Sequence, residues 1–339
     1  MRPISTTGHV PILWNSAIMA RLQILYDSLQ EFLWFQSLDD RFKDIVGREF
    51  PNVPSGNRNV DLALAYDRPD IVLMIDDRPI LVVERSEEVP SGHNVGQRFS
   101  RIVAAARAQA ACFYMFPFAA RKHGGATAGP RYVNLRLFRA MENLATIYGS
   151  PIISINWPVD PQFELVKGPE KDEMIRALVS RFLTVRMSAQ HQSFEKSAEV
   201  IAARDTIIRF AATIKRRGVY DEPPPSVKIL RTFDASRSLS IKSNDLPNTE
   251  EAVVYEIGMT YVRSDPYVGS AMLYDYLYAR RSPTKRYRSV ILVCPNITTA
   301  QWQKEAMKGT GNKSVRLFVE VADVIAFSNG YITKDKLVP

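Results

Sequence analysis

The stretch Pro69–Gln97, PDIVLMIDDRPILVVERSEEVPSGHNVGQ, decides the fold class of this chain. Two apolar runs, IVLMI and ILVV, flank the polar turn DDRP. Runs rich in β-branched residues that are bounded by an Asp/Pro turn predict a β-hairpin. Asp70 precedes the first strand and Glu84 closes the second, so a tight hairpin would bring the two carboxylates side by side. Paired carboxylate oxygens suit a hard divalent cation.

The sequence around the hairpin predicts a mixed α/β domain. Apolar residues recur at helical spacing over 95–110, and the apolar run 111–116 then ends at Pro117. A strand–helix–strand unit of this kind normally joins parallel strands. Upstream, helical spacing over 15–46 predicts a long helix and a shorter one, and the alternation over 60–66 predicts a strand before the hairpin. The expected order is therefore helix, three strands, helix, strand.

The rest of the chain divides by composition into a connector and a second domain. A charged, helical segment begins near residue 171 and leads into the proline-rich sequence YDEPPP at 220–225, which favours an extended linker. We therefore expect a domain with N-terminal helices at 1–170, a basic helical connector at 171–225 and a smaller α/β domain at 226–339.

The C-terminal part echoes the hairpin region. The sequence VVYE at 253–256 resembles VVE at 82–84, and a Val-Gly pair follows each after a polar loop. The echo fits a degenerate internal repeat, and it also fits two strand–helix–strand units that merely look alike. The second copy has no Pro-Asp pair one hairpin upstream, so a second active site is not predicted.

Composition favours an anionic partner. The 339 residues include 44 Lys and Arg against 36 Asp and Glu, a formal net charge of +8. Such an excess suits nucleic acid first and a membrane surface second. The cysteines, Cys112 and Cys294, lie in apolar runs, which predicts buried thiols in a reducing compartment. No apolar run reaches membrane-spanning length and no signal-peptide pattern opens the chain, so we expect a soluble, cytoplasmic protein that has no membrane partner.

The order of elements resembles the PD-(D/E)XK nuclease superfamily, which includes many type II restriction endonucleases. The residues that carry the resemblance are Pro69-Asp70, Glu84-Arg85-Ser86 and Gln97. It covers about residues 60–118 and implies a restriction-endonuclease-like core in which Asp70 and Glu84 hold Mg²⁺. A glutamine or basic side chain often comes from the next helix in this superfamily, which points here to Gln97 and Arg98 as catalytic residues. Most such enzymes cut double-stranded DNA as homodimers, so the resemblance also implies DNA and a second copy as partners.

Ser86 departs from the superfamily pattern, in which a lysine follows the second acid by two positions and positions or activates the attacking water. A serine hydroxyl can bind water but supplies no charge against the developing phosphorane. Ser86 therefore leaves the third catalytic role open. Arg85 alternates to the opposite face of a regular strand. Possible substitutes are Arg98, Arg101 and Lys122.

Polar and basic side chains elsewhere are candidate DNA contacts. His93 and Asn94 open the helix after the hairpin, where backbone N–H groups can bind a phosphate, although Asn94 also suits an N-cap. In the C-terminal part, basic residues interleaved with tyrosines suit contact with the DNA backbone. The full set is His93, Asn94, Arg101, Arg121, Lys122, Arg263, Arg280, Arg281, Lys285 and Arg286.

These observations predict a Mg²⁺-dependent endonuclease acting on double-stranded DNA, with a type II restriction enzyme as the first expectation. A repair, recombination or phage nuclease would carry the same residues. A non-catalytic DNA-binding or defence-complex subunit on a nuclease scaffold is the alternative from another class, with Ser86 as the mark of lost activity. Each acid also has a purely structural interpretation, Asp70 as the residue after a turn proline and Glu84 as a solvent-facing strand end.

Overall fold

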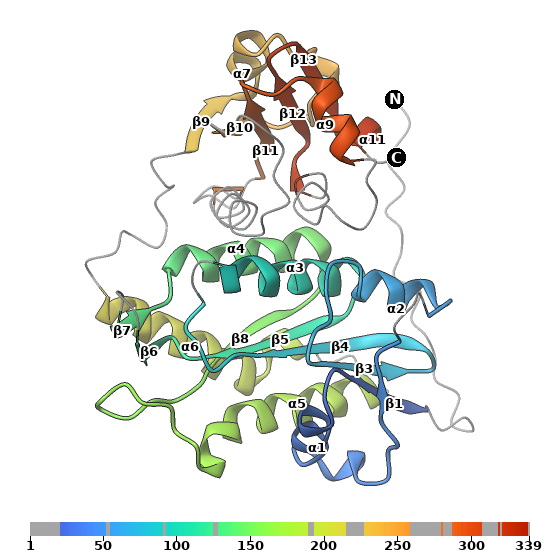
Figure 1. Ribbon diagram of the computed structural model, residues 1–339, viewed down its shortest axis with the longest axis vertical. Coiled ribbons are helices and arrows are strands. Elements are labelled where there is room, and N and C mark those ends of the chain that lie inside the picture. Colours follow the sequence, from blue (N-terminus) through green and yellow to red (C-terminus); the bar gives the residue numbers. More distant parts are fainter. Residues whose placement is uncertain are drawn as a thin grey trace.

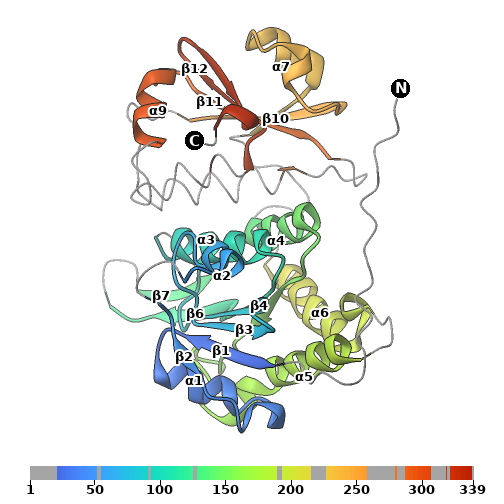
Figure 2. The same ribbon diagram turned by 90° about the vertical axis from the view of Figure 1, so that its right-hand side faces the viewer.

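Two separate β-sheets organise the protein, each with helices packed on it (Figures 1 and 2). The computed structural model describes residues 21–51, 55–90, 93–124, 128–188, 193–214, 227–257, 279–280, 287–306, 318 and 321–337. The architecture is mixed α/β, as the sequence predicts. The linker expected at 220–225 lies outside the described residues.

The first sheet has six strands in the order β2-β1-β3-β4-β5-β8. These strands are β1 (Leu22–Tyr26), β2 (Arg48–Glu49), β3 (Ile71–Ile75), β4 (Arg78–Arg85), β5 (Ala111–Phe116) and β8 (Ile152–Asn156). The strand β3 runs antiparallel to both of its neighbours, β1 and β4, whereas β4, β5 and β8 run parallel. The hairpin β3–β4 and the parallel strand β5 are confirmed.

The turn of the hairpin is tighter than the four residues expected from the sequence. Asp76 and Asp77 adopt φ values of 48° and 62°, and the next two residues already belong to β4. Positive φ at both central residues is the signature of a type I′ turn, whose twist matches that of the flanking strands. The turn pairs Ile75 with Arg78, and a β-bulge between Leu73 and Met74 then shifts the register by one residue, so that Ile71 pairs with Val83. The turn and the bulge together set the spacing of the candidate site.

Helices cover both faces of the first sheet (Figures 1 and 2). The helices α3 (His93–Arg107) and α4 (Leu135–Tyr148) lie on one face, and α1 (Leu29–Gln36) and α5 (Glu173–Met187) lie on the other. The helix α6 (Ala198–Thr213) packs beside the edge strand β8. Alternate residues of β4 and β5 enter two different apolar cores: Val82, Cys112, Tyr114 and Phe116 pack with α3 and α4, and Leu81, Val83, Phe113 and Met115 pack with α1 and α5. The sheet is therefore buried on both faces.

Two predicted elements before the hairpin are wrong. Part of the expected N-terminal helix is the strand β1, and its first residues lie outside the described chain. The expected strand over 60–66 is instead the helix α2 (Arg58–Ala63), which begins where the Asn57 side chain accepts hydrogen bonds from the N–H groups of Asn59 and Val60. The asparagine cap satisfies N–H groups that a helix start leaves free, and so favours the helix.

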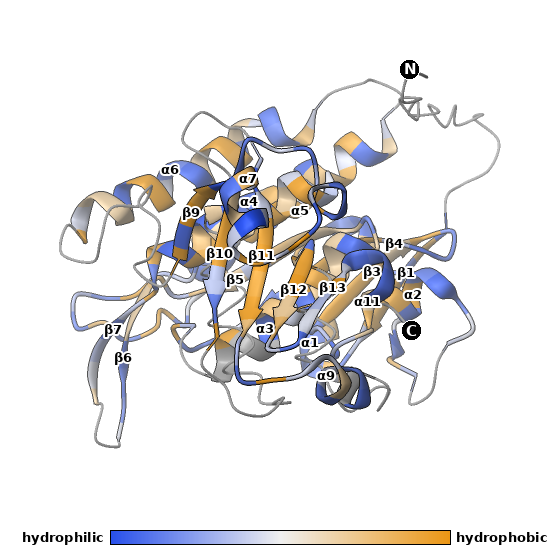
Figure 3. Ribbon diagram, turned by 90° about the horizontal axis from the view of Figure 1, so that it is seen from above, coloured by the Kyte–Doolittle hydropathy of each residue, from blue (hydrophilic) through white to orange (hydrophobic). Residues whose placement is uncertain are grey.

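The segment around Arg121, expected as a loop, is a small two-stranded ribbon. It consists of β6 (Ala119–Lys122) and β7 (Gly129–Tyr132) and projects from the body of the molecule (Figure 3). Short 3₁₀ turns connect other elements: η1 (Asp40–Phe42), η2 (Pro169–Asp172), η3 (Phe194–Lys196) and η4 (Ser243–Asp245).

The second sheet has five strands in the order β13-β12-β11-β10-β9. They are β9 (Val227–Arg231), β10 (Glu251–Glu256), β11 (Ser289–Cys294), β12 (Val324–Phe327) and β13 (Gly330–Thr333), with helices α7 (Thr232–Ser238), α9 (Thr299–Ala306) and α11 (Lys334–Leu337). An antiparallel pair, β9–β10, precedes two parallel neighbours, β11 and β12. This is the same sequence of strand directions as β3-β4-β5-β8, so the echo seen in the sequence extends to the topology. Among the helices of the described ranges, none combines the length and the apolar character needed to cross a bilayer.

Candidate active site

Asp70 and Glu84 lie next to each other at the end of the first sheet where β3 begins and β4 finishes. Asp70 directly precedes β3, and Glu84 directly follows Val83, the partner of Ile71 in the hairpin register. The carboxylate of Asp70 accepts a hydrogen bond from the backbone N–H of Arg85 at 2.5 Å. Asp70 is 7% exposed and Glu84 is fully buried. The structure therefore excludes the interpretation of Glu84 as a solvent-facing strand end.

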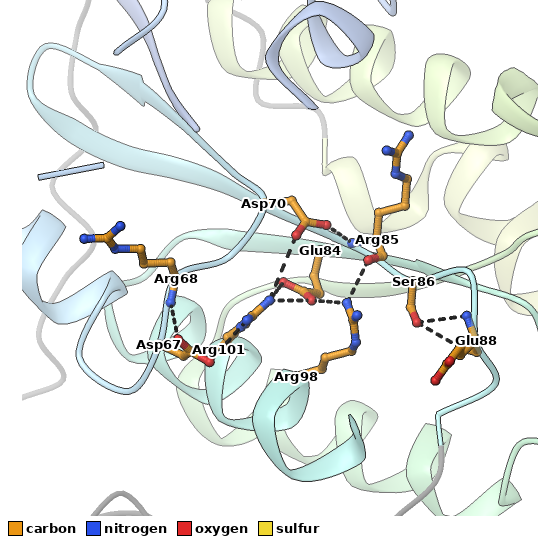
Figure 4. Close-up of polar contacts among 9 residues, drawn as sticks. All are labelled: Asp67, Arg68, Asp70, Glu84, Arg85, Ser86, Glu88, Arg98 and Arg101. Atoms are coloured by element: carbon orange, nitrogen blue, oxygen red, sulfur yellow. Dashed lines mark hydrogen bonds and ion pairs between the residues drawn. The ribbon is translucent and has the colours of Figure 1, made fainter. Parts of the chain in front are cut away.

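Two arginines of α3 bind the buried Glu84 (Figure 4). Arg98 donates through Nη1 to Glu84 Oε1 and also to the carbonyl oxygen of Arg85, the latter at 2.7 Å. Arg101 donates through Nη1 to both carboxylate oxygens of Glu84, at 2.9 and 3.0 Å. Residues three apart on a helix share a face, so the spacing of the two arginines directs both toward the sheet. Charge-assisted bonds of this kind compensate the burial of a carboxylate.

The guanidinium group of Arg101 lies among three acids. Its Nη2 is 3.1 Å from Asp67 Oδ2, and its Nη1 is 4.0 Å from Asp70 Oδ1 as well as bonded to Glu84. A positive group surrounded by carboxylate oxygens offsets their mutual repulsion. In this structure, Arg101 performs the charge balancing that a metal cation performs in a carboxylate site.

Burial dominates the electrostatics of both acids. It raises the pKa of Asp70 to about 8, with the neighbouring Glu84 charge and then the Glu31 charge adding to the effect. Burial also raises the pKa of Glu84, while Arg101 and Arg98 act in the opposite direction. Desolvation penalises the charged form of a carboxyl, and a nearby negative charge does the same. A bound cation would relieve both penalties.

The oxygen donors fit Mg²⁺, which proteins often bind through one or two carboxylates together with water and substrate phosphate. Within the described residues, no group of three or more His, Cys, Asp and Glu side chains is arranged to hold a metal ion. The acids that could hold a cation here are Asp70 and Glu84, and a cation would compete with Arg101 for their oxygens.

The side chains of Ser86 and Arg85 both make contacts away from the Glu84 carboxylate. The Ser86 hydroxyl donates to the carbonyl oxygen of Glu88 at 3.0 Å and accepts from the Glu88 N–H at 3.1 Å. The Arg85 side chain leaves on the opposite face, as alternation predicts, and its guanidinium lies 4.3 Å from the centre of the Trp34 ring and 5.8 Å from that of Trp157. Of the possible lysine substitutes Arg98, Arg101 and Lys122, the structure brings Arg98 and Arg101 to Glu84, whereas Lys122 is exposed on β6.

The other predicted residues are dispersed. His93, Asn94 and Gln97 belong to α3, but their side chains lie outside the described part, as do all of Arg263, Arg281, Lys285 and Arg286. Arg280 is in the C-terminal part that contains the second sheet, where it donates to Asp323 at 2.7 Å. Arg121 and Lys122 are on β6, and Arg121 Nε donates to the Gln162 carbonyl oxygen at 3.1 Å and lies 3.4 Å from Glu164.

Sequence reasoning missed Asp67 and Glu31. Asp67 is part of the loop before β3 and joins the site through its tertiary contact with Arg101, so no local pattern marks it. Glu31 carries a recognisable signal of another kind: with Ser28 it forms a capping box at the start of α1. Its influence on Asp70 follows from the backbone bond between the Asp27 N–H and the Asp70 carbonyl oxygen, which holds the start of α1 beside β3.

Comparison of the chain with protein-family models, with curated proteins and with solved structures gave no significant match.

Proposed function

We propose that the protein is a Mg²⁺-dependent endonuclease that hydrolyses phosphodiester bonds in double-stranded DNA. The observation that supports this most directly is the buried Asp70–Glu84 pair at the end of the β3–β4 hairpin, with two guanidinium groups beside it. Further support comes from the antiparallel pair β3–β4 followed by α3 and the parallel strand β5, because the resemblance to PD-(D/E)XK nucleases rests on this order of elements.

Each residue at the cluster has a role in this proposal. Asp70 and Glu84 hold the cation, which when bound activates water and offsets negative charge on the phosphate. Arg98, whose side chain is 26% exposed, lies at the accessible side of the cluster and supplies charge against the developing phosphorane, the role that Ser86 cannot fill. Arg101 keeps the acids compensated while no cation is bound.

Further support for a DNA substrate comes from charge. The chain carries a net +8, and β6 brings Arg121 and Lys122 beyond the carboxyl end of β5, the same sheet edge at which Glu84 lies opposite Tyr114. A type II restriction enzyme remains the first expectation, with a repair, recombination or phage nuclease as the alternative within the class. The buried free thiols of Cys112 and Cys294 suit the reducing cytoplasm.

A plasmid assay tests the proposal. We expect supercoiled or phage DNA to be cut in Mg²⁺ and left intact in EDTA, and Asp70→Asn and Glu84→Gln to abolish cutting without unfolding the protein. Asp172→Asn is the matched control, because Asp172 is also a buried acid but bonds Trp34 and Lys171 on the far side of the sheet. Undiminished cutting by both site variants would refute the assignment of the site.

A second candidate, a non-catalytic DNA-binding subunit, is favoured by the contacts of Glu84 and Ser86. Both oxygens of Glu84 already accept bonds from arginines, and the Ser86 hydroxyl is bonded to Glu88. In the same assay this candidate predicts a shift of DNA in a native gel that needs no Mg²⁺ and yields no fragments. A homodimer remains part of the nuclease proposal, and light scattering at assay concentrations tests it directly.

A further inference from the structure

Tyr114 occupies the position on β5 directly beside Glu84. The register of the parallel pair β4–β5 sets these two residues opposite each other. Both point to the α3 side of the sheet: Tyr114 belongs to the apolar core beneath α3 and α4, and Glu84 is bound by arginines of α3. Tyr114 is 1% exposed.

The hydroxyl of Tyr114 is buried without a hydrogen-bond partner among the described residues. An unmade bond of this kind is costly, and a buried polar group left in this state calls for a physical reason. The ring packs against Phe116, two residues on, with centroids 4.4 Å apart. A tyrosine hydroxyl carries its proton at neutral pH and is able to donate.

Glu84 is the acceptor that can use this donor. It is fully buried, and its Oε1 accepts from both Arg98 and Arg101, whereas Oε2 accepts from Arg101. If Arg98 turned outward to an anionic phosphate, Glu84 would lose a charge-assisted bond while still buried, which is strongly unfavourable for a carboxylate. A carboxylate has about four lone-pair sites, so a hydroxyl can take the vacated one.

We propose that Tyr114 is a reserve hydrogen-bond donor for Glu84, whose hydroxyl replaces Arg98 on the carboxylate when a DNA phosphate draws Arg98 away. Tyr114 is thus a positioning residue that acts through Glu84. The identity of the trigger rests on the proposed function, but the exchange of donors on Glu84 does not.

A double-mutant cycle tests the exchange without any ligand. In the wild-type background, Tyr114→Phe removes an unbonded hydroxyl, so we expect the urea midpoint of unfolding to stay the same or rise. In the Arg98→Met background, the hydroxyl is bonded to Glu84, and the same substitution is expected to lower the midpoint. Arg98→Gln serves as a second background should Arg98→Met fail to fold.

Tyr331→Phe is the matched control. The Tyr331 hydroxyl donates to Asp245 at 2.6 Å and accepts from the Lys242 N–H at 3.2 Å, both in the C-terminal part that contains the second sheet. Its removal is expected to lower the midpoint equally in both backgrounds. A lowered midpoint for Tyr114→Phe in the wild-type background, or an equal shift in both backgrounds, overturns the proposal.

Binding of a short DNA duplex in EDTA tests the trigger separately. Loss of a hydrogen bond to a charged group corresponds to a weakening of about tenfold or more, so we expect Tyr114→Phe to bind the duplex about tenfold more weakly than wild type. Wild-type protein that binds no duplex would contradict the proposed function, while the unfolding cycle would still decide the role of Tyr114. Equal affinities of wild type and Tyr114→Phe would remove phosphate as the trigger.

Discussion

Replacing Asp70 with asparagine should stabilise the metal-free protein above neutral pH, although it removes a proposed metal ligand. Asp70 has an ordinary pKa of 3.8 in the unfolded chain and a pKa of about 8 in the folded protein, chiefly because of burial. Between these values the folded protein holds a proton that the unfolded chain has released. The free energy of unfolding therefore falls as pH rises from about 4 to about 8, and this contribution is constant above pH 8.

The magnitude follows from the shift. One proton per molecule corresponds to about 1.4 kcal/mol for each pH unit. Over the window between 3.8 and about 8, the total reaches at most about 6 kcal/mol. The asparagine amide carries no titrating proton, and its carbonyl oxygen can still accept the Arg85 N–H. The difference between Asp70→Asn and wild type should therefore grow with pH in favour of the variant.

Urea unfolding at intervals from pH 5 to pH 9 measures this difference. Ile71→Val is the matched control, because Ile71 is the next residue, is fully buried and does not titrate. Its cost of about 0.5–1.5 kcal/mol should be the same at every pH. Parallel curves for wild type and Asp70→Asn would refute the reasoning, since they would mean that Asp70 binds no extra proton in the folded state.

Three further outcomes are expected. Because Asp70 must lose its proton to bind a cation, Mg²⁺ binding at pH 7 should release about one proton, and the Mg²⁺ affinity should rise up to about tenfold per pH unit until pH 8. Calorimetry in buffers of different ionisation enthalpy measures the released proton and the affinity. Binding heats that do not depend on the buffer would contradict the proton release. Arg85→Met should lower the free energy of unfolding by about 1–2 kcal/mol through loss of the stack on Trp34, while the backbone N–H that bonds Asp70 is kept; an unchanged free energy of unfolding in urea would argue otherwise. Asp77→Gly should raise the free energy of unfolding by up to about 1 kcal/mol, because Asp77 has a φ of 62° that glycine adopts without strain; a lowered urea midpoint would contradict this.

The hairpin, α3 and β5 could be predicted from the sequence because their determinants are local. The turn residues Asp76 and Asp77 sit between two β-branched runs, and tight turns fix the pairing of the strands that they join. Such a turn brings Asp70 and Glu84 to the same end of the hairpin, but the register that sets them side by side also depends on the β-bulge between Leu73 and Met74, which spacing alone does not predict. The sequence also showed the three-residue spacing of Arg98 and Arg101 on α3, but it offered them only as two of three candidates to replace the missing lysine.

Elements whose form depends on distant partners were not predictable. Leu22 and Leu25 have helical spacing, yet they belong to β1, which pairs with β3 along its whole length. A strand covered on both faces loses the alternation that identifies strands. The three-residue spacing of Leu22 and Leu25 therefore led to the wrong prediction of a helix. The same limit applies to the site: the contact of Arg101 with Asp67 joins residues 34 positions apart, and no local pattern encodes it.

The two sheets repeat one order of strand directions, but the described residues carry the acid pair in the first sheet alone. Glu84 is fully buried there, whereas Glu256, its counterpart in the sequence echo, is exposed on β10. A nuclease with this arrangement would have a stoichiometry of one hydrolytic centre per polypeptide. A double-strand break would then require two polypeptides or two successive encounters. Nicked circles should accumulate before linear DNA when the protein is dilute, and linear DNA should appear directly when it is concentrated enough to pair.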